Sequence, residues 1–100
     1  MAGEGERREG GTATYIVECF WPGVTEEKMD VAAARARWSA EELTRAGSPV
    51  RYVGSILVPV DEIVFFQFDG DSADAVRKAS EQAGIPFERI VESVQRGDYR

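Results

Sequence analysis

The chain has 100 residues, a formal charge of −6 and no histidine. This length fits one domain, and a hydrophobic content of 43% can build a core without disulfides or a structural metal. The acidic balance repels nucleic-acid backbones, and the apolar runs are too short to cross a bilayer. Without histidine, Ser-His-Asp and Cys-His catalysis are excluded. We therefore expect no nucleic-acid partner and no membrane partner.

The two ends of the chain are predicted to be tails around one folded unit. Residues 1–12 combine charges and glycines without a large apolar side chain, which is typical of disorder. The domain is expected over residues 13–96, with a polar tail at 97–100. Because no apolar signal region precedes the domain and Cys19 is the single cysteine, we expect a cytoplasmic protein without an internal disulfide.

The first half of the domain predicts a strand, a helix and a second strand. Residues 14–20 are rich in aromatic and β-branched side chains, and a Trp-Pro-Gly turn ends that strand. Thr25 is a suitable N-cap for a helix that runs to about residue 46. Residues 50–58 predict the second strand. The buried stripe expected on the helix comprises Met29, Ala33, Ala36, Ala40 and Leu43.

The second half predicts the same order of elements. A hairpin connection at 59–62 leads into a strand at 63–68. Asp71 or Ser72 caps a second helix, and the last strand covers about residues 87–95. The buried stripe expected on this helix is Val76, Ala79 or Ser80, and Ala83.

The pattern Ala-Gly-x-Pro occurs twice, at 46–49 and 83–86, each time between a helix and a strand. Two strand–helix–strand halves of similar length predict an α+β fold, the ferredoxin-like β-α-β-β-α-β sandwich. Right-handed crossovers then place both helices on one face of a four-stranded antiparallel sheet.

The predicted sheet has large apolar side chains on both faces, although two helices can cover only one. In the first strand, Ile16, Glu18 and Phe20 point away from the helices, and in the third strand Phe65 and Gln67 do so. Such a face favours a homodimer through the open sheet face, or a small-molecule ligand on it. An exposed face that is merely somewhat apolar is the remaining alternative.

Glu18 is the principal candidate for a functional residue. Its carboxylate lies between Ile16 and Phe20 along one strand face, so it needs a cation or a hydrogen-bond donor if that face is buried. It could bind a ligand or act as a base, and the alternatives are a dimer-interface salt bridge and a solvated position. The ligand-binding residues expected on this face are Glu18, Phe20, Phe65, Gln67, Arg51 and Arg89, with the two arginines as candidate partners of Glu18.

Three other features have simpler interpretations. Cys19 should face the helices and behave as a small hydrophobe. Asp69-Gly70-Asp71 resembles part of a calcium loop but lacks the glutamate at position twelve, so helix capping explains these carboxylates better. Trp38 either covers its own helix or contacts a partner protein.

Several segments together resemble a family of small uncharacterised bacterial ferredoxin-like domains that includes a nickel-binding, nickel-responsive dimer. The resemblance covers roughly residues 14–94 and implies a homodimer that binds nickel. The segments that carry it are Tyr15-Ile16-Val17-Glu18 with Trp21-Pro22, Val50-Arg51-Tyr52-Val53 with Ser55, Ala83-Gly84-Ile85-Pro86, and Arg89-Ile90-Val91-Glu92.

The chain departs from this family in its second helix. The family carries a histidine there, where this chain has Arg77-Lys78-Ala79-Ser80. Metal ligands are then limited to carboxylates, Cys19 and backbone groups, and oxygen-rich sites suit harder ions than nickel. We expect no metal site from these residues, and the sequence identifies no cofactor.

The open sheet face and the family resemblance leave three functions to consider. The first is a homodimeric binding protein with a small ligand or a metal between its sheets, to which no catalytic residue is assigned. The second is a cofactor-independent enzyme of the dimeric α+β barrel type, such as a monooxygenase or an isomerase. The third is a regulatory module that binds another protein.

Overall fold

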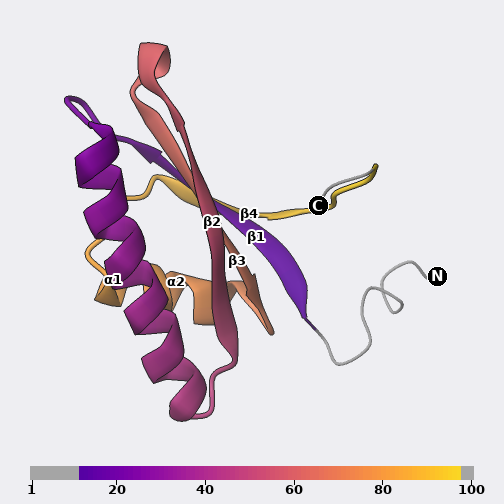
Figure 1. Ribbon diagram of the computed structural model, residues 1–100. Coiled ribbons are helices and arrows are strands. Elements are labelled where there is room, and N and C mark those ends of the chain that lie inside the picture. The colour runs from indigo at the N-terminus through magenta and orange to yellow at the C-terminus, as the bar shows by residue number, and fades with distance from the viewer. Residues whose placement is uncertain (1–11, 98–100) are drawn as a thin grey trace.

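Four antiparallel strands and two helices follow one another in the order β-α-β-β-α-β. The computed structural model describes residues 12–97, so all but one residue of each expected tail lies outside the described part. Figure 1 shows both helices on the same side of the sheet, which confirms the ferredoxin-like α+β fold. The elements are β1 (Ala13–Phe20), α1 (Glu26–Arg45), β2 (Val50–Val58), η2 (Pro59–Asp61), β3 (Ile63–Gly70), α2 (Ala73–Gln82) and β4 (Arg89–Ser93).

The helix boundaries follow from the capping residues. Thr25 accepts a hydrogen bond from the Lys28 backbone N–H, and Ser72 accepts one from Ala75, so both helices begin where a hydroxyl satisfies a free amide. Gly47 follows α1 with a φ of 101°, a left-handed conformation that glycine adopts without steric cost. No helix among residues 12–97 is both long enough and apolar enough to cross a membrane.

The strand order is β2-β3-β1-β4, so β1 and β3 are the central strands. β3 extends two residues beyond its predicted end because Asp69 and Gly70 pair with both neighbouring strands. β4 is shorter than predicted and is confined to Arg89–Ser93, where it pairs with β1 alone.

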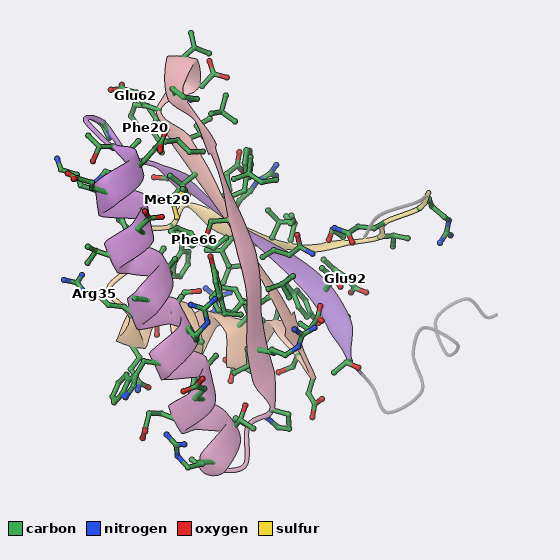
Figure 2. The ribbon with its side chains drawn as sticks, in the orientation of Figure 1. Phe20, Met29, Arg35, Glu62, Phe66 and Glu92 are labelled. Atoms are coloured by element: carbon green, nitrogen blue, oxygen red, sulfur yellow. The ribbon has the colours of Figure 1, made fainter. Side chains whose placement is uncertain are left out.

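The core lies between the sheet and the two helices. The sheet contributes large side chains, among them Phe66 and Phe68, whereas the buried residues of the helices are mainly alanine and serine. Figure 2 shows Phe66 in this layer. Ser39 of α1 donates a hydrogen bond to the Ala79 carbonyl of α2, so close packing of the helices also satisfies a buried hydroxyl.

The buried stripe of α1 differs from the prediction. Ala32 and Ser39 are buried, whereas Ala33, Met29 and Leu43 are only partly buried. The difference arises because α1 packs against α2 as well as against the sheet, which rotates its buried side toward α2. Helical periodicity identified the apolar side of α1 but could not locate this second neighbour.

The β2–β3 hairpin is tied to the turn between β1 and α1 through Glu62. Its backbone carbonyl accepts a hydrogen bond from the Trp21 amide at 2.7 Å, and its side chain accepts one from the Gly23 amide at 2.9 Å. Glu62 itself has a φ of 55°, in the left-handed region. These bonds fix the position of Trp21 at the edge of the helical layer.

Candidate functional site

The side chains of the open sheet face form rows across the four strands, because residues paired in register share a face. The central row is Ile56, Phe65, Glu18 and Arg89. The row toward the hairpin is Val58, Ile63 and Phe20, and the row on the other side is Gly54, Gln67, Ile16 and Val91. The last row, Arg51, Asp69, Thr14 and Ser93, is polar.

All six candidate residues lie on this face, but the structure does not bring all of them together. Glu18, Phe65 and Arg89 share the central row, and Phe20 and Gln67 occupy the rows beside it. Phe20 is 51% exposed at the end of β1. Arg51 belongs to the polar row at the far end and does not join the others.

Glu18 forms an ion pair with Arg89. The Arg89 Nε lies 2.5 Å from Glu18 Oε1, and the Glu18 side chain is 28% exposed while that of Arg89 is 67% exposed. The adjacent Glu88 reinforces this junction, because its amide donates to the Glu18 carbonyl and its carboxylate accepts from the Phe20 amide. The start of β4 is thereby fixed to β1 at Glu18 and at Phe20.

The expectation that Arg51 could pair with Glu18 was wrong. β3 lies between β2 and β1, so Arg51 is two strands away from Glu18. Arg51 Nη2 instead lies 2.8 Å from Asp69 Oδ2, and the Thr14 hydroxyl donates to the other oxygen of Asp69 at 2.8 Å. Asp69 is therefore an open-face residue of β3 rather than a helix-capping group, and Ser72 provides the cap.

Sequence reasoning missed the contribution of the edge strands to this face. Ile56 of β2 is 59% exposed and Val91 of β4 is 37% exposed, and both stand in register with candidate residues. Side chains along β2 and β4 alternate between the two faces of the sheet, and this alternation was the signal that could have identified Ile56 and Val91. Gly54 pairs with Gln67 and has no side chain, so this position adds no side-chain surface to the face.

Cys19 follows Glu18 in the chain but lies on the opposite face, fully buried beneath the helices. Burial, and then the nearby carboxylates of Glu88 and Glu18, raise the pKa of the Cys19 thiol from 9.0 to about 12. The thiol therefore stays protonated at neutral pH and is neither a nucleophile nor a ready metal ligand.

The fold and its open face define a small ferredoxin-like α+β domain, and comparison with known proteins places it in a family. The family model described as nickel responsive protein SCO4226-like matches residues 15–92, so the chain belongs to this family. The crystal structure of SCO4226 from Streptomyces coelicolor A3(2) aligns with a TM-score of 0.66 and 21% sequence identity, over 85% of this chain and all of that one. This likeness shows the shared fold. No curated protein matches the chain.

The residues present do not fit a nickel site within one chain. The sequence has no histidine, and the Cys19 thiol is protonated and buried. The carboxylates of Glu18 and Asp69 hold Arg89 and Arg51. Over residues 12–97, no three histidine, cysteine, aspartate or glutamate side chains are grouped so that they could hold a metal ion.

We predict that nickel binds weakly or not at all. Imidazole is the side-chain ligand that suits nickel, and this chain has no histidine, while its one thiol is buried and protonated. Isothermal titration calorimetry on protein prepared without a histidine tag, before and after treatment with a chelator, measures the binding. The prediction would be contradicted by a titration that shows tight, stoichiometric nickel binding to the wild type and no such binding to Cys19→Ala.

We also predict that the Cys19 thiol makes folding stability fall at high pH. Below pH 9.0 the thiol is protonated in both states, and between 9.0 and about 12 the unfolded chain loses its proton while the folded protein keeps it. Ionisation therefore favours the unfolded chain in this interval. Urea unfolding at several pH values should show a steeper loss of stability for the wild type than for Cys19→Ala. Equal slopes would contradict the assigned pKa.

Proposed function

We propose that the protein is a homodimeric binding protein without catalytic activity. Two copies pack their open sheet faces together and hold a small ligand between the sheets, beside Glu18. The observation that supports this proposal is the size of the apolar surface on a face that the helices leave uncovered. Its exposed members lie on three strands and include Phe20, Ile56 and Val91.

The area of the face suits self-association. The four strands have eight, nine, eight and five residues in chain order and lie about 4.8 Å apart, so the face presents roughly 480 Å² per copy before side-chain relief is added, against ~800 Å² per partner in a standard interface. The polar row of Arg51, Asp69, Thr14 and Ser93 lies at one end, where it would form the rim. A closed two-fold dimer uses the same patch on both copies, so it covers both apolar faces at once.

The Glu18–Arg89 pair supports a ligand site within that interface. Arg89 binds Oε1 of Glu18, so the other carboxylate oxygen is oriented to accept from a ligand donor. Phe65 and Ile16 stand beside Glu18 in the register and supply apolar surroundings for the rest of the molecule. Gly54 has no side chain, so none stands between the Gln67 side chain and the neighbouring edge strand β2 at this register position.

We favour binding over catalysis because Glu18, the residue considered as a base, is engaged by Arg89. The ligand class is a small molecule with at least one hydrogen-bond donor and an apolar body. A cytoplasmic location belongs to the same proposal, since a single buried thiol suits a reducing compartment.

Ile16→Lys should convert a wild-type dimer into a monomer at micromolar concentration. The substitution places a charge in the middle of the proposed interface but leaves the helix-covered core unchanged. Val60→Lys is the matched control, because Val60 is 88% exposed at the hairpin tip, away from the sheet rows. Sedimentation equilibrium distinguishes the species, and a wild type that is monomeric well above this range would overturn the proposed dimer.

Glu18→Gln should leave folding and dimerisation nearly intact while it removes a co-purified small molecule. The amide keeps the size of the side chain and an oxygen that can accept from Arg89, but it loses the negative charge that the ligand uses. Asp69→Asn is the matched control, because it alters the other open-face ion pair at the polar rim. Native mass spectrometry reports assembly and bound mass together. Equal ligand content in the wild type and both variants, or a wild type without ligand, would contradict the proposed binding site. Neither result would bear on the proposed dimer.

A further inference from the structure

A hollow lies on the helix side of the molecule, between α1 and the loop that follows α2. It has a volume of about 320 Å³. Its apolar lining includes Trp21, Val31 and Pro86, and Gly84 leaves one wall without a side chain. Lys28 and Arg35 are its charged residues. We call this hollow the α1 groove.

Both charged residues of the α1 groove are cations, although the chain as a whole carries a charge of −6. Lys28, Val31 and Arg35 recur at helical spacing along α1, so an apolar side chain stands between two positive ones. Figure 2 shows Arg35 pointing away from the sheet. Among residues 12–97, no carboxylate pairs with either cation, and Lys28 Nζ donates to the Gly23 carbonyl, at 3.2 Å.

The cations of the neighbouring groove between α1 and β2 are already engaged. Arg37 lies over the Tyr52 ring, 5.0 Å from its centroid, while Arg45 pairs with Glu42. Arg51 pairs with Asp69 on the open face. In the α1 groove, by contrast, neither cation has a carboxylate or aromatic-ring partner among residues 12–97, so an anion can pair with them without displacing an existing partner.

We propose that the α1 groove binds a small amphipathic organic anion. The acid group lies between Lys28 and Arg35, and the apolar body packs against Trp21, Val31 and Pro86. Val31 is 53% exposed, so the ligand would remove an apolar side chain from water while its acid group offsets part of the positive charge of Lys28 and Arg35. The groove belongs to the helical layer, so it stays open whichever partner covers the sheet face. This site is separate from the one at Glu18.

Intrinsic fluorescence can test the site directly. The chain has two tryptophans, and Trp38→Phe leaves Trp21 as the single tryptophan, whose emission can be excited separately from that of the three tyrosines. Sodium decanoate, used below its micelle-forming concentration, should change the Trp21 emission in a saturable way. Decanol should bind more weakly, and decyltrimethylammonium should have no effect.

Charge reversal separates the groove from general hydrophobic binding. On the Trp38→Phe background, Lys28→Glu and Arg35→Glu should each weaken decanoate binding at least about tenfold. Lys78→Glu makes the same change of charge on α2, outside the groove, and should leave the affinity unchanged. Circular dichroism checks that each variant is folded, and Arg35→Gln provides a milder replacement if a reversal disturbs the helix.

Three outcomes would overturn the proposal. The first is equal affinity for decanoate and decanol, which would mean that the cations do not contribute. The second is an equal loss of decanoate affinity in Arg35→Glu and Lys78→Glu, which would mean that binding depends on the overall charge of the protein and not on the groove. The third is co-sedimentation with phosphatidylglycerol vesicles without saturable binding of free decanoate, which would identify a lipid surface as the partner instead.

Discussion

The structure depends on one imbalance: two helices cover one face of a sheet whose central strands are apolar on both faces. β3 shows it most clearly, since Phe66 is fully buried under the helices while Phe65 belongs to the open face. Burial under the helices stabilises the single chain. The opposite face has the same kind of side chains and no covering element among residues 12–97, and both the proposed dimer and the proposed ligand site follow from that fact.

The charged residues of the open face are paired with one another, so they limit the ways in which a partner can bind to this face. Glu18 and Arg89 satisfy each other in the central row, and Asp69 is satisfied by Arg51 and Thr14 at the end of the sheet. A charge with no hydrogen-bond partner in the middle of this face would oppose association, whereas a bonded charge only restricts the geometry in which two faces can meet. Most of the open face is thus apolar, and its charged groups are confined to the Glu18–Arg89 and Asp69–Arg51 pairs.

Membership of the nickel-responsive family coexists here with residues that do not suit nickel. The fold is shared, but the one thiol is buried and two carboxylates of the open face hold arginines. A fold can keep its shape while the chemistry of its surfaces changes, because the core and the surface use different residues of the same strands. We therefore propose that the recognition chemistry of this chain lies in its sheet face and its α1 groove rather than in a metal centre.

The sequence by itself determined the order of elements, the capping residues Thr25 and Ser72, and the alternation that sends Glu18 and Cys19 to opposite faces. These features are local, because they depend on period, turn chemistry and neighbours within a few residues. Only the tertiary structure decided the partners. It assigned Arg89 and not Arg51 to Glu18, turned α1 toward α2, and brought Trp21 beside Lys28 and Arg35. These contacts depend on how the elements pack in space, and no local pattern encodes which strand lies between two others.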